Sequence, residues 1–526
     1  MKNLTLIFIL LPMFTLANQG CRLWQESDST AELVIGEITL SVDNIFDLSK
    51  KEENKKFHRY ANKWHMNTKE KTINRELLFE EGDKYDARLI KETERLIRAK
   101  AFIKEVDIYP VEICGNRVNV NVDTKDNWTL TPGISFGRTG GKSKYSFELQ
   151  ERNLFGQGKS LELKYRKDID RVQRSIKYSD DNLFASRNHL DVIYENNSDG
   201  KLRFINLYRP FFSLDVEYSW GIEFLDHDLV NSLYERGEIN DEIGQNRQLY
   251  SARFGKLVKR TKKVVHRYNI GLTADESRFF NSDKFPHTIL PDFRSYQYPW
   301  ISYEYFGENY IERTNFNSMG RQEDISLGHR FNAKIGKSFS DSSIHYDFSY
   351  AKGFYDDGNN LILLDTYFNG IYQTRSLLNS RLGGNLKWFH FQSHNKTFFS
   401  SVLIEKASNL FLENRQYLGS DTGLRGYPFR YLQGKNKFLI TLEQRYFYNW
   451  YPLKTFQFAS ALFIDSGAAW DDSIDSNHVT NIGFGFRFVP TRTSSSKAIH
   501  VDLTMPLDER SDVGNWQIQL RTRKSF

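Results

Sequence analysis

From residue 125 to the end of the chain, apolar and polar residues alternate in segments of roughly ten residues, separated by runs rich in Gly, Asn, Asp and Ser. In 161–166 and 344–350, aliphatic or aromatic residues occupy one parity and mostly charged or polar residues the other. Because successive side chains of a strand point to opposite faces, each segment is expected to have one apolar and one polar face. The pattern predicts a long series of antiparallel hairpins, with the polar stretches 226–246 and 275–293 as long loops.

Residues 18–124 have a different, mixed pattern. The segment 33–40 is rich in β-branched residues and predicts a strand. Asp86 is a favourable N-cap for a helix with an apolar stripe along one face. Two more strands are predicted at 103–111 and 117–123. This order predicts a small α/β domain over 18–124, followed by an all-β domain over 125–526.

The first residues have the layout of a secretory signal. An apolar run from Leu4 to Leu16 is followed by the small residue Ala17, after which a signal peptidase would cleave. The alternative is a lipoprotein acylated at Cys21, but the three residues before this cysteine match a lipobox poorly. We therefore expect residues 1–17 to be a signal peptide.

Composition narrows the class of the β domain. After the signal, no run of about 18 apolar residues is present, which argues against membrane-spanning helices. Mean hydropathy is −0.58, yet aromatic residues make up 15% of the chain. Overall polarity, many aromatic residues and a secretion signal together favour a transmembrane β-barrel, whose strands alternate lipid-facing and lumen-facing residues. A soluble, secreted all-β protein would have the same alternation and is the alternative.

Charge and cysteine content add two expectations. The net charge of +6 arises from 72 basic and 66 acidic residues, and this near balance gives no nucleic-acid-binding signature. The two cysteines, Cys21 and Cys114, would lie in an oxidising compartment. Spacing alone leaves a disulfide and two free thiols equally open.

No enzyme or metal site is expected. Gly133 to Gly137 matches the G-x-S-x-G pattern, but that motif requires a strand-to-helix elbow, and this region is all β. The stretch 137–143 is one residue short of a phosphate-binding loop and has no following helix, so it is interpreted as a hairpin turn. His58 and His65 have no companion at metal-ligand spacing. We therefore expect no catalytic residue, cofactor or metal.

A glycine-rich stretch, 418–427, contains the candidate site. Its glycines permit tight turns and a close approach to a barrel wall. In the two strand-like segments that follow, alternation places Glu443 and Asp465 on the inward, polar face. A buried Arg425 would be costly unless its planar guanidinium met carboxylates, which these two residues could provide. The hypothesis is a buried latch inside a barrel.

The motifs around this latch resemble those of a known family. Leu424, Arg425, Gly426 and Tyr427 are similar to the [VL]-R-G-[FY] signature of the BamA and TamA outer-membrane assembly superfamily, and 463–467 resembles its F-x-D-x-G strand. The resemblance implies that Arg425 enters the barrel and pairs with Glu443 and Asp465. It also implies a barrel of about sixteen strands, whereas the alternation gives about fifteen segments before the latch and about five after it. Sixteen is favoured, with an enlarged barrel as the alternative.

The small N-terminal domain resembles a POTRA domain, the periplasmic module that precedes such barrels. The resemblance rests on the order of its elements and on the stretches 79–85 and 101–106. It implies a single POTRA-like unit that offers a sheet edge to client polypeptides by strand addition. An α/β adaptor without a client is the alternative.

The last segment also carries a signal. It alternates and ends in an aromatic residue, which resembles the signal by which outer-membrane barrels are recognised for insertion. The residues expected to carry this signal are Trp516, Ile518, Leu520 and Phe526.

Together these observations predict a mainly β protein, with a transmembrane antiparallel barrel of about sixteen strands or more behind a POTRA-like domain. The expected location is the bacterial outer membrane, with the N-terminal domain in the periplasm. The expected partners are outer-membrane lipids and client polypeptides, and the expected role is insertion or translocation of polypeptides. A secretion pore for one partner and a passive channel or surface-binding barrel are the alternatives.

Overall fold

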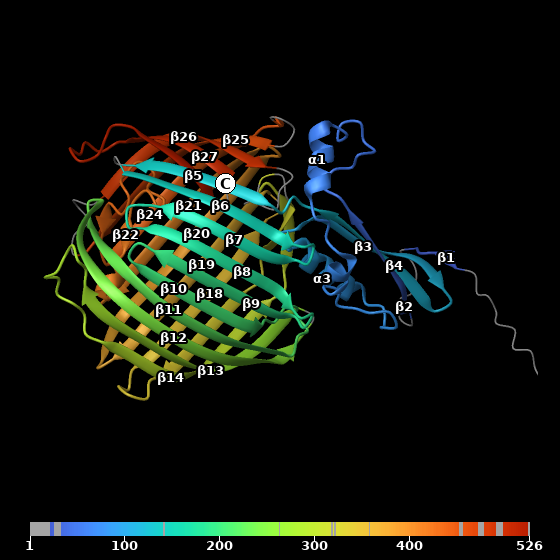
Figure 1. Ribbon diagram of the computed structural model, residues 1–526, viewed down its shortest axis with the longest axis horizontal. Helices are drawn as coiled ribbons and strands as arrows, with labels where there is room; N and C mark the ends of the chain where they lie inside the picture. Colours follow the sequence, from blue (N-terminus) through green and yellow to red (C-terminus); the bar gives the residue numbers. More distant parts are fainter. Residues whose placement is uncertain are drawn as a thin grey trace, which may run out of the picture.

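The computed structural model describes residues 21–25, 33–139, 142–261, 263–316, 319, 322–356, 358–451, 456–471, 478–490 and 498–523. The expected signal peptide, 1–17, and the chain end at Phe526 lie outside the described residues. A small α/β domain is followed by a large antiparallel barrel, which fills most of Figure 1. The predicted fold class is confirmed.

The N-terminal domain is a four-stranded sheet with three helices. Its strand order is β1-β3-β4-β2, with β2 parallel to β4 and β3 antiparallel to it. The elements are β1 (Arg22–Leu23), β2 (Val34–Asp43), α1 (Lys56–Trp64), α2 (Glu70–Asn74), α3 (Ala87–Arg98), β3 (Ile103–Cys114) and β4 (Arg117–Asp126). Strand β4 therefore runs two residues past the expected boundary at 124.

Helix α3 forms where the sequence predicts it. The Asp86 side chain caps its first turn by accepting a hydrogen bond from the Arg88 N–H at 2.8 Å. The apolar stripe turns Ile90 and Ile97 inward, onto the core of the domain. Sheet residues from β2, β3 and β4 complete this core, so the helix is held by packing on one face of the sheet.

Cys21 and Cys114 form a disulfide. The bond joins the residue before β1 to the end of β3, and β1 pairs with β3 only at Ile113 and Glu112. The question that spacing left open is settled in favour of the bond, which pins the short edge strand to the sheet.

Over the described residues the barrel contains twenty strands, so the favoured count of sixteen is wrong and the enlarged barrel is correct. Fifteen of these strands precede the latch and five follow it, as the alternation indicated, and the resemblance to smaller barrels favoured the lower number. The strands are β5 (Thr131–Thr139), β6 (Lys142–Leu154), β7 (Lys159–Lys167), β8 (Val172–Leu183), β9 (Asn188–Asn197), β10 (Gly200–Arg209), β11 (Tyr218–Glu235), β12 (Glu238–Arg260), β13 (Val264–Asn281), β14 (Arg294–Gly307), β17 (Arg330–Lys337), β18 (Ile344–Tyr355), β19 (Asn360–Gln373), β20 (Ser376–Ser393), β21 (Lys396–Ser408), β24 (Asn436–Phe447), β25 (Phe456–Trp470), β26 (His478–Pro490), β27 (Ala498–Pro506) and β28 (Gln517–Arg523).

One part of the wall is taller than the sequence indicates. The stretch 226–246, expected to be a loop, belongs to the paired strands β11 and β12, which have 18 and 23 residues. Its many polar residues predicted a loop. Strands that extend beyond the apolar band of a barrel can, however, be polar on both faces. The second stretch, 275–293, ends β13 and then forms a true loop before β14.

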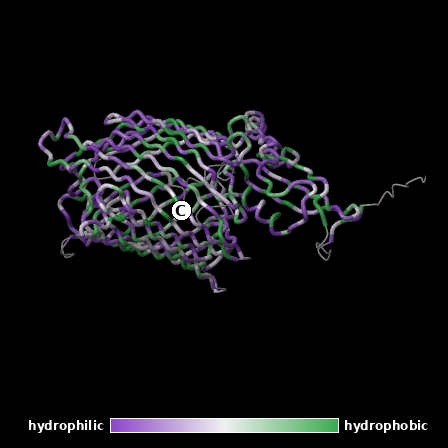
Figure 2. Tube along the Cα trace, turned by 90° about the horizontal axis from the view of Figure 1, so that it is seen from below, coloured by the Kyte–Doolittle hydropathy of each residue, from purple (hydrophilic) through white to green (hydrophobic). Residues whose placement is uncertain are grey.

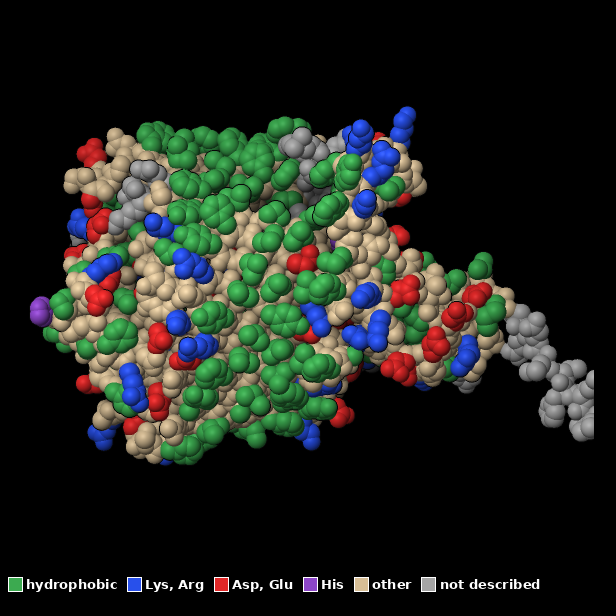
Figure 3. All heavy atoms as spheres, in the orientation of Figure 1, with side chains coloured by type: hydrophobic (Ala, Val, Ile, Leu, Met, Phe, Trp, Pro, Cys, Tyr) green, Lys and Arg blue, Asp and Glu red, His purple; other side chains and the backbone are tan. Residues whose placement is uncertain are grey.

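The barrel has an apolar exterior and a polar lumen. Hydrophobic side chains form a broad band over the outer wall (Figure 3), and the hydropathy alternates along the strands (Figure 2). Such a band is what a transmembrane barrel presents to lipid. Strongly exposed members of the band are Ile134, Phe147, Ile176, Ile222, Ile270, Ile301, Leu382, Ile404, Leu462 and Ile518. Among the described residues, no helix has the length and apolarity needed to cross a membrane.

The N-terminal domain is docked on the turns at one end of the barrel, here named the proximal end (Figure 1). The carbonyl of Gly156 accepts hydrogen bonds from the Lys69 N–H at 3.0 Å and the Thr72 hydroxyl at 2.8 Å. The Arg187 guanidinium donates to the Leu77 carbonyl at 2.7 Å. Gly156 has a φ of +69°, and a Cβ there would lie 2.3 Å from the Asn67 carbonyl oxygen. Only glycine permits this close approach.

Candidate functional site: a latch in the barrel lumen

The segment between β21 and β24 starts at the end of the barrel opposite the N-terminal domain, named here the distal end, and folds back into the lumen. Its short elements are η1 (Leu412–Asn414), β22 (Tyr417–Leu418) and β23 (Leu432–Gln433), with β22 and β23 paired. Leu418, Leu424 and Tyr427 are fully buried in a cluster that includes Leu439 of β24 and Val479 of β26. This packing fixes the glycine-rich stretch, named here the latch loop (418–427), against the inner wall.

Arg425 is buried and forms a bidentate pair with Asp465 of β25. Its Nε and one terminal nitrogen lie 2.8 Å from the two carboxylate oxygens of Asp465. The guanidinium also stacks over the Phe463 ring, with 3.3 Å between its central carbon and the ring centroid. Thr441 and Asn481 donate to the same carboxylate at 3.0 Å each, so Asp465 is well satisfied. Bidentate geometry and extra donors are what a buried ion pair requires.

Glu443 of β24 is the second carboxylate near the latch, with an oxygen 3.7 Å from a terminal nitrogen of Arg425. It also lies 3.8 Å from Arg445 and 3.9 Å from Arg487. Arg487 of β26 in turn donates to Asp502 of β27 at 2.6 Å. Three arginines and three carboxylates therefore form one buried, charge-balanced cluster across four adjacent strands, and balance lowers the cost of burying them.

Two glycines allow the latch loop to approach the wall closely. The Gly426 N–H donates to the Asn481 side chain at 3.1 Å, and a Cβ on Gly426 would lie 2.6 Å from the Asn481 Cβ. Gly423 has a φ of +122°, and a Cβ there would lie 2.6 Å from Leu439. Any larger side chain would push the loop away from β24 or β26.

Tyr427 of the latch loop is also held by hydrogen bonds. The Tyr427 hydroxyl contacts the Asp508 carboxylate at 2.6 Å and the Thr480 carbonyl at 2.9 Å. The Thr480 N–H donates to the same carboxylate at 2.7 Å. Asp508 lies in the distal segment between β27 and β28, so the latch loop is tied to a neighbouring distal loop as well as to the wall.

The backbone carbonyl of Arg425 connects the latch to the last strand. The Gln519 side-chain amide, on the lumen face of β28, donates to this carbonyl, and the Thr504 hydroxyl of β27 lies 3.4 Å from it. Strand β28 closes the barrel beside β5, where a Cβ on Gly137 would lie 3.3 Å from the Leu520 carbonyl oxygen. One residue, Arg425, therefore contacts both β25 and the closing strand.

Sequence reasoning brought Arg425, Glu443 and Asp465 together but missed Asn481, Arg487, Asp502 and Gln519. Arg487 and Asp502 alternate with apolar residues along β26 and β27, yet their contacts run across neighbouring strands and depend on register. The sequence signal for these four residues is a polar or charged side chain at an inward position on each consecutive strand after the latch.

The described residues of the expected C-terminal signal share the outer face of the last strand and the residue before it. Trp516 and Ile518 are exposed outward, with 59% and 65% of their surfaces accessible, and Leu520 is half-buried near the seam between β28 and β5. Gln517, Gln519 and Arg521 alternate with them toward the lumen. Phe526 lies outside the described residues.

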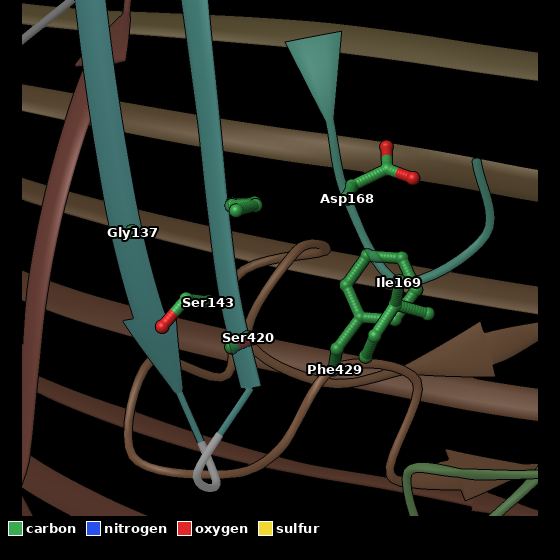
Figure 4. A pocket seen from close by; sticks show the side chains of 7 residues that line it. Gly137, Ser143, Asp168, Ile169, Ser420 and Phe429 are labelled. Carbon is green, nitrogen blue, oxygen red and sulfur yellow. The ribbon is translucent and has the colours of Figure 1, made fainter. Parts of the chain in front are cut away.

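Polar space remains between the latch loop and the seam. A cavity of about 520 Å³ is bounded by the inner faces of β5, β6, β7 and β28 and by Asp421 and Arg430 of the latch segment. A small cavity of about 30 Å³ lies beside it, where Ser420 and Phe429 face Gly137 and the turn at Asp168 (Figure 4). The inner side of the seam is therefore lined with polar groups and accessible to water.

A second segment enters the lumen from the proximal end. Between β14 and β17, a hairpin is formed by β15 (Tyr310–Thr314) and β16 (Gln322–Ser326). Phe316 packs against Phe389 in a tilted arrangement, with 4.7 Å between ring centroids, in a cluster that includes Leu361. Met319 belongs to a cluster with Phe463, the ring on which Arg425 stacks. Segments thus enter the lumen from both ends, and both contact Phe463 of β25.

The base of this hairpin is tied to the N-terminal domain. Arg98 of α3 lies 3.3 Å from Glu312 on β15 and 3.6 Å from Asp324 on β16. Arg95 of α3 stacks over the Tyr310 ring at 5.4 Å. Burial raises the pKa of the Asp324 carboxyl, and the Arg98 charge opposes this effect. A continuous set of contacts therefore leads from α3 through the hairpin to the wall beneath the latch.

Comparisons with known proteins give only distant similarities. No family model and no curated relative matches the chain. CdiB from Acinetobacter baumannii superposes with a TM-score of 0.46 at 12% identity, over 93% of this chain and 74% of that one. BamA from Haemophilus ducreyi lacking POTRA domains 1–3 gives 0.43 at 12% identity, over 96% and 90%. CdiB from Escherichia coli gives 0.45 at 10% identity, over 96% and 81%. These similarities are too low to assign a function. The proposal that follows therefore rests on the residues described above.

Proposed function

We propose that this protein is an outer-membrane barrel that inserts or translocates polypeptides at the bacterial outer membrane. The observation that carries the proposal is the double engagement of Arg425. Its side chain is locked to Asp465 on β25, and its carbonyl is held by Gln519 on β28, the strand that closes the barrel. A passive channel has no need for an internal loop bound to its closing strand.

The function follows from what this arrangement does to the seam. When β28 separates from β5, unpaired backbone groups at their edges become available to another chain, and strand addition satisfies them without requiring a particular sequence. The latch keeps the adjoining wall and loop in register while the seam opens. The water-accessible space of about 520 Å³ behind the seam gives polar loops of a client a path that avoids lipid.

In this proposal the N-terminal domain acts in the periplasm as a POTRA-like unit. Among the described residues, strand β1 covers β3 only at Ile113 and Glu112, and Trp24 adds one hydrogen bond to Val111. The part of β3 near Asp107 has exposed side chains. It offers a sheet edge to an extended client segment on the way to the barrel.

A photo-crosslinking residue in place of Asp107 tests this function in living cells. The matched control carries the same residue in place of Lys91, an exposed position on helix α3 and off the sheet. Capture of many nascent barrel proteins from position 107, and not from 91, is the expected result. Capture of one secreted partner would favour the dedicated secretion pore instead. Equal labelling at both positions, without a client, would contradict both roles and favour a passive barrel.

A further inference from the structure

Helix α1 carries an exposed aromatic stripe that plays no part in the latch. Phe57, Tyr60 and Trp64 have 65%, 62% and 78% of their surfaces accessible. Their spacing of three and four residues places them on one side of the helix. The adjacent side, with His58 and Ala61, is buried against the domain. These three large aromatic side chains form an exposed hydrophobic patch on one side of the helix, and such a patch indicates an interaction surface.

Basic residues flank this stripe. Lys56, Arg59 and Lys63 are exposed on the same helix, and the helix contains no acidic residue. Three more lysines precede it at positions 50, 51 and 55, with Glu52 and Glu53 between them. Figure 3 shows basic side chains gathered at this corner of the molecule, next to the apolar band of the barrel. An aromatic stripe with a basic flank is the residue pattern of a helix that lies in a membrane interface.

The helix is fixed where the chain enters the barrel wall. Ala61 belongs to a small cluster with Ile45 and Phe46, and Trp128 packs against that cluster just before β5. At the end of the helix, the His65 ring contacts the buried Asp126 carboxylate at 2.9 Å. The first outward side chains of the barrel, such as Leu130 and Ile134, follow directly. The stripe is therefore held beside the start of the lipid-facing surface.

The orientation of the helix fits the same partner. In Figure 1, α1 lies at the proximal rim of the barrel, with its axis across the barrel axis. A barrel axis follows the membrane normal, so α1 runs along the plane of the bilayer. Interfacial helices lie in this plane, with their apolar side chains in the region between headgroups and acyl chains.

We propose that α1 binds the surface of the proximal leaflet, and that its partner is an anionic phospholipid bilayer. Phe57, Tyr60 and Trp64 insert at the headgroup level, where amphipathic rings are favoured. The lysines and Arg59 contact the phosphates. This contact anchors the N-terminal domain beside the first strand of the seam. It requires the barrel to lie in a bilayer but does not depend on the proposed handling of polypeptides.

A second copy of the chain fits this surface less well. Two α1 helices meeting through their stripes would bring their basic flanks together, and like charges oppose that contact. The negative surface of an anionic leaflet complements the same flank. Charge therefore favours lipid over self-association.

Quenching by brominated lipids tests the proposal in the full chain. Its two cysteines are bonded to each other, so Tyr60→Cys introduces a single reactive thiol for an environment-sensitive fluorophore. The protein is reconstituted into vesicles of phosphatidylethanolamine and phosphatidylglycerol, with or without bromine on the acyl chains near the headgroup. Either insertion direction places the N-terminal domain against one leaflet. The matched control carries the label at Glu37→Cys, on the exposed part of β2 remote from the barrel.

The expected result is at least threefold stronger quenching at position 60 than at position 37. Adding Phe57→Ser and Trp64→Ser should reduce quenching at 60 toward the control value, and replacing phosphatidylglycerol by phosphatidylcholine should weaken it. Equal, weak quenching at 60 and 37 would overturn the proposal. So would self-quenching between the position-60 fluorophores of two copies without quenching by the brominated lipid, because it would identify a second chain as the partner.

Discussion

Arg425 and Asp465 lie forty residues apart in the sequence and form a two-pronged ion pair inside the barrel, with both N–O distances at 2.8 Å. Arg425 belongs to the latch loop and Asp465 to β25, so the pair fastens a distal loop to the barrel wall. Both groups are almost completely buried. Breaking one partner of such a pair leaves the other charged and uncompensated.

We therefore expect Arg425→Ala to destabilise the barrel by about 3–5 kcal/mol, because Asp465 loses its partner in a buried site. Asp465→Ala should have a similar effect. The double variant should cost less than the sum by about 0.5–3 kcal/mol, since each change removes the same interaction. Unfolding in guanidinium, followed by tryptophan fluorescence, measures the free energy of unfolding of all three variants. Strictly additive losses would show that the pair does not act as a unit.

Gly426→Ala should also loosen the latch. The added Cβ would lie 2.6 Å from the Asn481 Cβ, so the loop must move away from β26, at a cost of about 1–3 kcal/mol. Gly514→Ala is the matched control, since a Cβ there meets no atom nearer than 3.6 Å. Unfolding midpoints of the two variants provide the comparison. A Gly426→Ala protein as stable as Gly514→Ala would mean that the close approach is not needed.

Gln519→Ala should weaken the closing strand. The variant removes the donor that holds the Arg425 carbonyl, so amide protons of β28 are expected to exchange several-fold faster than in the unaltered protein. Ile518→Ala, on the outer face of the same strand, is the control and should change exchange less. Hydrogen exchange in nanodiscs with mass spectrometry resolves the two. Unchanged exchange in the Gln519→Ala protein would separate the latch from the seam.

The proximal hairpin should reduce the flow of ions through the lumen. Gly307 and His329 are already joined by a backbone hydrogen bond of 2.7 Å, so residues 309–327 can be removed without stretching the barrel. We expect this deletion to increase single-channel conductance in planar bilayers several-fold, because Phe316 and Met319 no longer fill the lumen. Glu312→Ala with Asp324→Ala is the milder control. It breaks partly exposed ion pairs worth up to about 1 kcal/mol each and should change conductance little.

If the deletion leaves conductance unchanged, the latch segment alone occludes the lumen. If the Glu312 and Asp324 control conducts as strongly as the deletion, the contacts with α3 are what holds the hairpin in place. The first outcome would contradict the view that the hairpin closes the path, and the second would contradict the view that its apolar tip is what holds it there.

Much of this fold follows from local patterns. Alternation places Glu443 and Asp465 on the lumen face because parity along a strand fixes the face of each side chain. It also yields the segments that become the twenty strands, although the resemblance to smaller barrels favoured a lower number. The cap at Asp86 and the apolar stripe behind it predict α3 for the same local reason.

Contacts between distant segments could not be predicted in this way. The hairpin of β15 and β16 consists of two strands of five residues each, too short to give an alternation that stands out from a loop. The contact between Arg98 and Glu312 joins residues 214 positions apart. The approach of Gln519 to the Arg425 carbonyl depends on how the last strand closes the barrel. Each of these depends on register and closure, which periodicity does not encode.

The most direct test of the proposed function is capture of a client at the seam. A photo-crosslinking residue replaces Ile518 on β28, or Phe484 on β26 as the control, since both side chains face the lipid. In living cells we expect polypeptide adducts from position 518 but only lipid adducts from position 484, and fewer polypeptide adducts from 518 when Arg425 is changed to alanine. Lipid adducts alone at both positions would contradict a barrel that opens its seam to clients.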